Sequence, residues 1–562
     1  MTSSMEPDRN IFEQLASVPT LLLQSIDVFA LEMRVVLTAL ICIYIASHGS
    51  IRRPPSAKLP ETGKNGQKNE RRERDDERVH SLLPSDAIIF PISAAIILTG
   101  LYYVIQWLED PDILNKILRV YFSIMSFASL GKLFGDGLQF LVGFVFPTVW
   151  IGNDRKLYHI DSEKRRQWYA ANGTGGRIWD HQKNSPLPGP LSGLKLSNTT
   201  AEKLWKIRHF FSEEWTVRLV IHGIVNEKVN VKFNDILGFV LALGVNLLYH
   251  IIHSTFISNI MGYAFSYSGI IFLSPTTFAT GCVTLFGLFI YDIVMVFYTP
   301  YMITVATKID APMKLVFEAP TRTSMLGLGD IVLPGIFIGL CLRFDHYMHY
   351  YRQRKLKEVE LKTEDASSGQ LTTRKATQHM VIKPEYVDPQ GQWGDYFWGT
   401  KLSKIFRPDA TPALKASTFP KPYFHAALVG YAIAMIATLV ILITFNHAQP
   451  ALLYLVPGVV MAICVTGAVR GEFREMWEYT EDGSLDTMDV IVEVDGEGNI
   501  TQTRNGNDKD ESSDEEEEGD GKATEKGHIP NDEALATEKT GKDRAERYPV
   551  FLLSIESPEL DQ

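Results

Sequence analysis

Long apolar segments constrain this chain more than any other feature of its 562-residue sequence. A helix that crosses a bilayer needs about 20 mostly apolar residues. Clear segments of that length lie at about 87–107, 277–298, 325–343, 423–445 and 450–469, and weaker ones lie at about 28–47, 114–134, 235–252 and 255–273. The clear segments are too long and too uniformly apolar for the core helices of a soluble protein. The sequence therefore predicts an all-α polytopic membrane protein with nine transmembrane helices.

Two further observations affect the helix count. Residues 137–150 are apolar but short and contain Pro147, so we interpret them as a re-entrant or interfacial extension of the third helix. The first apolar segment carries Glu32 and Arg34 near its beginning, and no cleavage pattern of small residues follows it. We therefore expect this first helix to be retained rather than removed as a signal peptide.

The positive charges between the apolar segments predict the orientation in the membrane. Residues 48–86 contain nine Lys and Arg residues, whereas the first 27 residues contain only Arg9. Because cytoplasmic loops carry the excess of positive charge, we expect the N-terminus outside and the C-terminus in the cytoplasm. The basic stretches 152–233 and 344–422 then also fall on the cytoplasmic side.

These spans and charges define the expected organisation of the chain. The order is an outside segment 1–27, helices one to three in 28–151 with the basic loop 48–86, a cytosolic loop 152–233, helices four to seven in 234–343, a cytosolic insertion 344–422, helices eight and nine in 423–470, and an acidic, disordered cytosolic tail 471–562. The tail holds 28 Asp and Glu against 9 Lys and Arg, so its charge is −19 and the rest of the chain carries +8 of the −11 total.

Cysteine content excludes other classes of protein and site. Four cysteines in a chain of this length exclude a disulfide scaffold, and all four lie in predicted spans with spacings that match no metal site. We expect no metal, no cofactor and no nucleic-acid partner.

Two carboxylates inside the predicted spans are the first candidates for chemistry. Asp292 and Asp330 each cost about 2.5–3.5 kcal/mol to insert at the centre of a membrane helix. The chain runs outward through one helix and back through the next, and each Asp lies roughly 9 Å from the outer end of its helix. Two carboxyls that meet at low dielectric share one proton, so one can act as a base and the other as an acid. This arrangement is typical of aspartic proteases.

Glycines next to one carboxylate support this interpretation. In Gly327-Leu328-Gly329-Asp330, two residues without side chains precede the carboxylate, which lets a substrate backbone come close and lets the helix begin irregularly. Pro334 weakens the helix again one turn later. Small residues also pack membrane helices together, so this motif by itself leaves both interpretations open.

Three motifs in this chain resemble those of a known family. Tyr291-Asp292, Gly327-Leu328-Gly329-Asp330 and Gln449-Pro450-Ala451-Leu452 are similar to the three signatures of the GxGD intramembrane aspartyl proteases, the family of the signal peptide peptidases, to which presenilin is related. The segments 311–317 and 85–92 are also similar to that family. The resemblance covers about 28–343 and 423–475.

The resemblance implies a nine-helix protease of the endoplasmic reticulum membrane, with a lumenal N-terminus and with Asp292 and Asp330 as the catalytic pair. It implies that Tyr291 supports Asp292, that Gly327, Leu328 and Gly329 give conformational freedom and substrate access, and that Pro450, Ala451 and Leu452 shape the active site. Expected substrates are remnant signal peptides and type II or tail-anchored membrane proteins, bound within the lipid bilayer. Homo-oligomers and degradation factors bound through the cytosolic tail are left open as partners.

Some features depart from the family pattern or allow other functions. The insertion at about 350–420 and the long tail exceed that pattern, and the chain ends without a dilysine signal, so residence in the endoplasmic reticulum rests on the resemblance alone. One alternative is an ion-coupled transporter in which Asp292 and Asp330 relay protons. Another is a protease-like scaffold that recruits degradation factors.

Overall fold

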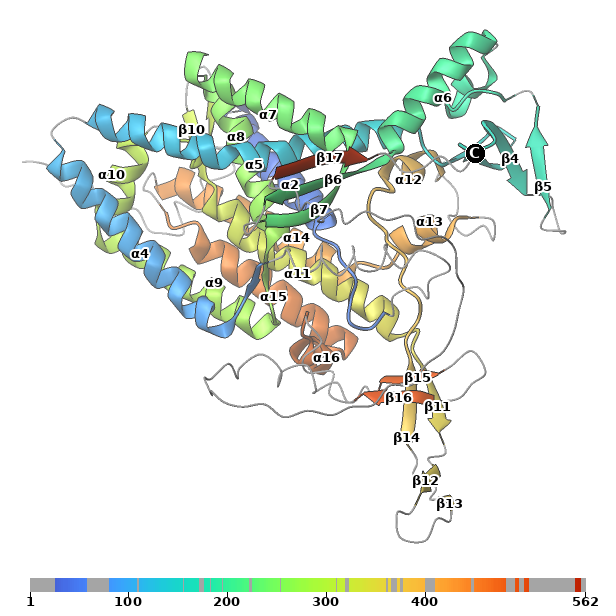
Figure 1. Ribbon diagram of the computed structural model, residues 1–562. Coiled ribbons are helices and arrows are strands. Elements are labelled where there is room, and N and C mark those ends of the chain that lie inside the picture. The colour runs from blue at the N-terminus through green and yellow to red at the C-terminus, as the bar shows by residue number, and fades with distance from the viewer. Residues whose placement is uncertain are drawn as a thin grey trace, which may run out of the picture. The chain divides into compact units, whose positions relative to one another are not determined.

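The computed structural model in Figure 1 describes most of the chain outside its two ends. The described residues are 26–57, 80–108, 111–154, 156–170, 176–181, 183–194, 196–221, 225–252, 254–309, 311–318, 323–359, 362–364, 371–373, 378–399, 410–445, 449–481, 491–494, 500–504 and 551–556. The expected outside segment 1–27, except its last two residues, and most of the acidic tail therefore lie outside them. The chain divides into one unit made of residues 1–212 and 233–486 and a second made of residues 213–232 and 487–562.

Eight helices of the first unit are long and apolar enough to cross a membrane, counted over the described residues. They are α2 (Ile26–Gly49), α4 (Pro84–Trp107), α5 (Pro111–Val145), α7 (Phe233–Ile252), α9 (Phe278–Ile293) with the π-helical turn η2 (Val294–Tyr298), α11 (Gly329–Tyr351), α14 (Pro422–Phe445) and α15 (Leu452–Arg470). The chain is thus a mostly helical, multi-pass membrane protein, as the sequence predicts.

The ninth expected segment also forms a helix, but this helix is less apolar than the eight above. It forms α8 (Thr255–Phe272), whose polar residues include Ser258, Asn259 and Ser266. Ser266 is completely buried against neighbouring helices. A helix enclosed in this way needs fewer apolar residues than one that faces lipid. Because α8 is not among the eight helices that are apolar enough to cross a membrane, the expected number of nine spans is not confirmed.

Helix α11 occupies the centre of the bundle (Figure 1). It packs against α2, α8, α9, α14 and α15. Of the residues in its 18-residue apolar stretch, 89% are buried. Gly335 allows the closest of these approaches, because a Cβ atom there would lie 2.5 Å from Ile270 of α8. By contrast, only 11% of the residues in the corresponding apolar stretch of α4 are buried, and the exposed side chains of α4 include Ile88, Ile89 and Ile96. Exposed aliphatic side chains of this kind are suited to contact with lipid.

Most of the short apolar segment at 137–150 lies in helix α5. It continues without a break to Val145, and the short strand β2 (Val149–Ile151) follows it. The segment is therefore mostly an extension of the third expected helix. α5 packs closely against α7, where Gly238 faces the backbone of Gly131 and Gly135.

The loop between α5 and α7 and the insertion after α11 contain strands that the sequence did not predict. β2, β3 (Leu157–Asp161), β4 (Arg166–Ala170) and β5 (Arg177–Asp180) form an antiparallel sheet in that order, followed by η1 (Gly189–Gly193) and α6 (Asn198–Ser212). The insertion holds β11 (Lys355–Val359), paired with β14 (Gln378–Ile382), and β12 (Lys362–Glu364), paired with β13 (Leu371–Thr373). It also holds α12 (Trp393–Gly399) and α13 (Pro412–Ser417). The Asp395 carboxylate of α12 accepts the Thr148 N–H at 2.5 Å and so attaches the insertion to β2.

The described residues of the second unit lie mostly in strands. β17 (Phe551–Glu556), β6 (Glu214–Ile221) and β7 (Val225–Lys232) form one antiparallel sheet in that order. β15 (Ile491–Val494) and β16 (Ile500–Arg504) form a separate hairpin.

Gly238→Ala should loosen the contact between α5 and α7. The new Cβ would lie 2.5 Å from the Gly135 nitrogen and 2.8 Å from the Gly131 oxygen, and backbone atoms cannot move aside cheaply. We expect a loss of about 1–3 kcal/mol of stability, read as a lower midpoint of thermal unfolding in detergent. Gly244→Ala on the same helix is the matched control, because nothing lies within 4 Å of its Cβ position. An equal midpoint for the two variants would contradict the close packing.

Candidate active site

Asp292 lies near the end of a helix whose start is firmly capped. Thr277 precedes α9, and its hydroxyl accepts the Thr280 N–H at 3.0 Å. Asp292 is in the last turn of α9 and is 3% exposed. The π-helical turn η2 follows at Val294. Such turns widen the helix and often occur at functional sites, so the regular backbone changes directly after the carboxylate.

Asp330 lies at the start of α11. The hairpin of β9 (Lys314–Glu318) and β10 (Thr323–Gly327) leads into this helix, and α11 begins at Gly329. Asp330 is therefore in the first helical turn and is half-buried. A Cβ atom at Gly327 would lie 3.3 Å from its Oδ2 atom, which is tighter than most side-chain contacts. The missing side chain at Gly327 thus leaves space beside the carboxylate.

The two carboxylates approach each other from α9 and α11. They are close enough for their charges to repel, and a site of low dielectric strengthens that repulsion. Such a pair favours the state with one shared proton. The two carboxylates thus lie in the same region of the bundle, which is compatible with the paired acid and base chemistry expected from the sequence.

The start of α15 contributes the third part of the site. α15 begins at Leu452, and the Leu452 N–H donates to Asp292 Oδ2 at 2.9 Å. The Pro450 and Ala451 carbonyls accept later N–H groups of the first turn, from Leu453 and Leu455. Free N–H groups and the positive end of the helix dipole at this terminus favour a nearby negative charge. The backbone of this motif, rather than its side chains, therefore contacts Asp292.

The residues singled out by the sequence motifs lie in three segments of the chain, at the end of α9, between β10 and α11, and at the start of α15. They are Tyr291, Asp292, Gly327, Leu328, Gly329, Asp330, Pro450, Ala451 and Leu452. Tyr291 is half-buried and packs against the main hydrophobic core, as does Leu328. The supporting roles of these residues remain predictions.

Two residues near the site were missed from the sequence. The Tyr431 hydroxyl of α14 donates to the Asp330 main-chain oxygen at 3.1 Å, and this tyrosine is completely buried. The Asn259 side chain of α8 binds both the N–H and the C=O of Val316 in β9, at 2.9 and 2.7 Å. A polar group in an apolar helix must find a partner. This requirement was the only signal in the sequence that pointed to Tyr431 and Asn259. It did not identify the partner.

The described residues contain no cluster of three or more His, Cys, Asp or Glu side chains arranged to hold a metal ion.

Comparison with known proteins gives a consistent set of similarities. A family model described as signal peptide peptidase matches residues 74–483. The signal peptide peptidase of Mus musculus is 31% identical over 272 residues, which is 47% of this chain and 53% of that relative. That of Homo sapiens is 30% identical over 282 residues, with 49% and 56% covered. Intramembrane protease 2 of Caenorhabditis elegans is 31% identical over 278 residues, with 48% and 47% covered. The chain spans about half the length of these curated relatives.

Removing one backbone donor should weaken the site without changing any side chain. Replacement of Leu452 by the corresponding α-hydroxy acid exchanges its N–H for an ester oxygen and deletes the hydrogen bond to Asp292. Hydrogen bonds to charged groups contribute about 1.5–3 kcal/mol, so we expect cleavage of a membrane-embedded substrate to slow about ten- to hundredfold.

The same ester placed at Leu453 is the control, because the Leu453 N–H bonds only weakly, at 3.3 Å, to the Pro450 oxygen. Equal rates for the two ester proteins would show that the contact between α15 and Asp292 has no part in the chemistry.

Proposed function

The chain belongs to the signal peptide peptidase family, and on this premise we propose that it is an intramembrane aspartic endopeptidase that hydrolyses peptide bonds within transmembrane segments. The observation that carries the proposal is the meeting of three distant motifs, in which Asp292 lies near Asp330 and also binds the N-terminus of α15. The family match favours this function over the transporter and scaffold hypotheses.

The proposed reaction uses the two carboxyls as a pair. The ionised member takes a proton from a water molecule, which attacks the carbonyl carbon of the substrate peptide bond. The protonated member donates to the carbonyl oxygen and stabilises the charge that develops there. The C–N bond then breaks as the carboxyl that took the water proton passes it to the leaving nitrogen, and the other carboxyl regains its proton as the carboxylic acid product forms, so the pair again holds one proton. The Leu452 N–H donates to Asp292 Oδ2 and holds this oxygen in place, so we propose Asp292 as the base and Asp330 as the acid at the start of the reaction.

A substrate helix must partly unwind before its peptide bond can react, and its freed N–H and C=O groups then need partners inside the membrane. The hairpin that leads to Asp330 is suited to supply them. Asn259 binds both main-chain groups of Val316, which therefore point away from β10. Val316 is paired with Met325. Because antiparallel pairs alternate between hydrogen-bonded and non-hydrogen-bonded, the Met325 N–H and C=O point to the opposite edge of the hairpin.

In the described part of the chain this edge is open in one sense: β10 pairs with no strand other than β9, and helix α2 also contacts β10. The Met325 side chain is 55% exposed. The edge ends at Gly327, three residues before Asp330. An unwound substrate that adds to β10 as a strand would thus have its backbone held beside the carboxylate.

The finer features of the proposal come from the family resemblance and the charge pattern. We propose residence in the endoplasmic reticulum membrane, a lumenal N-terminus and a cytosolic C-terminus. Remnant signal peptides and type II or tail-anchored proteins are the proposed substrates. Two relatives are named signal peptide peptidase, which supports the first of these substrate classes. Homo-oligomers and degradation factors are proposed as partners.

Substitution of either carboxylate tests the activity directly. Asp292→Asn and Asp330→Asn each keep the size of the side chain but cannot share the proton, so we expect purified protein to cut a signal-peptide substrate below the limit of detection. Mass spectrometry of the products and size-exclusion profiles of the variants are the measurements. Undiminished cleavage by either folded variant would refute the proposed function.

Met325→Pro tests the open edge. Proline lacks the N–H that faces the edge, whereas the pairing of β10 with β9 does not use that group. We expect kcat/KM to fall about tenfold, while Met325→Ala, which keeps the N–H, stays near the unsubstituted protein. An unchanged kcat/KM for a folded Met325→Pro protein would exclude strand addition at this edge.

A further inference from the structure

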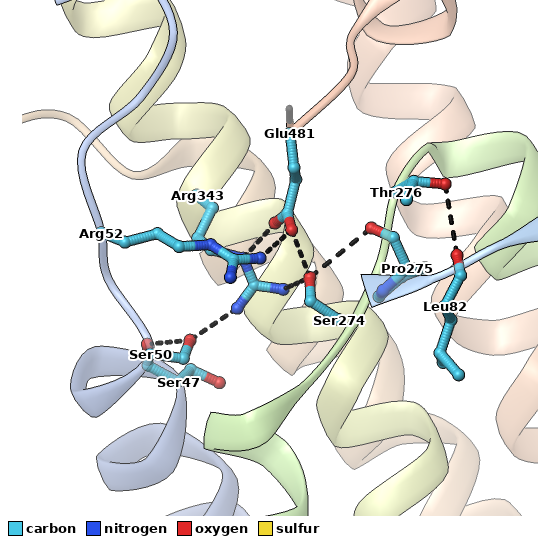
Figure 2. A network of polar contacts seen from close by, with 9 residues as sticks. All are labelled: Ser47, Ser50, Arg52, Leu82, Ser274, Pro275, Thr276, Arg343 and Glu481. Carbon is cyan, nitrogen blue, oxygen red and sulfur yellow. Dashed lines mark hydrogen bonds and ion pairs between the residues drawn. The ribbon is translucent and has the colours of Figure 1, made fainter. Parts of the chain in front are cut away.

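A polar network lies at the other end of the two helices that carry the carboxylates. Figure 2 shows Glu481 reaching toward the side chains of Arg52 and Arg343, with Ser274 beside them. These residues come from four parts of the first unit: Arg52 follows α2, Ser274 lies in β8 (Leu273–Pro275), Arg343 lies in α11, and Glu481 follows α16 (Phe473–Glu478). None belongs to the motifs of the candidate active site.

The Glu481 side chain is buried, and both of its carboxylate oxygens accept hydrogen bonds. Its two oxygens accept from the guanidinium groups of Arg343 and Arg52 and from the Ser274 hydroxyl. The side chains of Glu481 and Arg343 are only 6% and 3% exposed. Burial by itself raises the pKa of Glu481, but the two arginines and the hydroxyl outweigh burial and hold its pKa below the usual value. Loss of one partner from such a buried pair leaves an uncompensated charge, which is strongly destabilising.

Arg343 extends the network from Glu481 to two other elements. Its Nη1 atom donates to the Ser50 hydroxyl at 2.7 Å, and its Nη2 atom donates to the Ser274 hydroxyl at 2.8 Å. A Cβ atom at Gly339, one turn earlier, would lie 3.2 Å from Nη1. The guanidinium group thus joins α11 to the end of α2, to β8 and to Glu481 in one fixed plane.

Backbone hydrogen bonds connect the same segment to the start of α9. The Glu481 N–H donates to the Thr276 oxygen at 3.0 Å, and Thr480 forms a bridge with Thr277, the residue that caps α9. Thr276 in turn donates through its N–H to the Leu82 oxygen at 3.3 Å. Leu82 ends β1 (His80–Leu82), which is paired with β8.

Tyr479 joins the two helices through apolar contacts. Its ring centroid lies 6.1 Å from Phe278, the first residue of α9. It lies 5.3 Å from Phe344 and 4.9 Å from Tyr347, both on α11. Residues 479–481 therefore contact both helices at the same level, through rings, backbone and charge.

The network lies at similar distances from the two carboxylates. Asp330 precedes Arg343 by 13 residues, and Asp292 follows Thr277 by 15 residues. At 1.5 Å per residue these distances are roughly 20 and 22 Å. A tilt of about 5° over a helix of that length moves its far end by about 2 Å. A misplacement of about 1 Å is enough to cost a hundredfold in rate.

We propose that Glu481 is a positioning residue for the carboxylate pair: by joining the base of α9 to Arg343 of α11, it sets the relative placement of Asp292 and Asp330. This inference rests on the proposed function, because its readout is proteolysis. It predicts that weakening the network lowers the rate of the chemical step more than it weakens the docking of substrate.

Glu481→Gln is the main variant, because it keeps the size of the side chain and removes the charge. Glu478→Gln is the matched control, since Glu478 lies three residues away and forms an exposed ion pair with Arg474. With folded protein isolated by size exclusion, we expect Glu481→Gln to lower kcat about ten- to hundredfold with KM within about twofold. The affinity for an inhibitor with a hydroxyl in place of the scissile carbonyl should fall in parallel with kcat, and Glu478→Gln should change neither.

Two further variants separate positioning from mere stability. Glu481→Asp keeps the charge with a shorter reach, so it should fold and show an intermediate kcat even where Glu481→Gln does not fold. The double variant Glu481→Gln with Arg343→Gln removes both members of the most buried pair, so it should recover thermal stability without recovering kcat. A wild-type kcat in folded Glu481→Asp and Glu481→Gln, or full recovery of kcat along with stability in the double variant, would overturn the inference.

The outcome is also distinguishable from a failure of the proposed function. If Asp292→Asn is inactive while folded Glu481→Gln keeps the wild-type kcat and inhibitor affinity, only the positioning role fails. If Asp292→Asn remains active, the proposed function fails first and the positioning role fails with it.

Discussion

The burial of α11 is the constraint on which the rest of the first unit depends. A charged side chain on a helix enclosed by neighbours is costly unless it finds a partner there, because water is not available to replace one. The Asp345 carboxylate accepts the Phe424 N–H at 2.9 Å and the Tyr423 N–H at 3.3 Å, and so caps the start of α14 from outside that helix. Arg343 is held by Glu481. Asp345 and Arg343 thus attach α11 to the start of α14 and to the segment that follows α16.

This constraint also explains which parts of the structure could be predicted from the sequence. Membrane spans are visible because lipid demands an apolar surface over a fixed length, and α4 and α14 match their expected ranges closely. The two Asp residues were visible because a carboxylate in such a span is costly. Their equal depth was not confirmed: Asp330 lies in the first turn of α11, which begins at Gly329, and not roughly 9 Å inside a helix that begins at 325.

Other features could not be predicted because they depend on residues that are far apart in the chain. Tyr431 is 101 residues from Asp330, and Glu481 is 138 residues from Arg343. A sequence shows that such polar groups need partners, but it does not show which ones they find. Helix α8 illustrates the related problem of the ninth span, since its enclosure by other helices, and not its own apolar content, makes its polar residues acceptable.

The sheet β2–β5 was missed for a different reason. Its strands have only three to five residues, and aromatic and charged residues occupy both of its faces. Strands of this length show too few alternations for the period of two to be recognised. The attachment of α12 to β2 through Asp395 joins segments about 250 residues apart, so it too became visible only in the structure.

The two ends of α9 and α11 differ in a way that suits the intramembrane proteolysis proposed above. At one end, residues 479–481 join both helices through buried charges, backbone pairing and aromatic rings. At the other end, regular helix gives way to the π-helical turn after Asp292 and to the hairpin before Asp330. Rearrangement of irregular backbone costs less than breaking a buried ion pair. Under the proposed function, a substrate would enter by movement of the irregular backbone beside the carboxylates, while the network that we propose to position α9 and α11 stays intact.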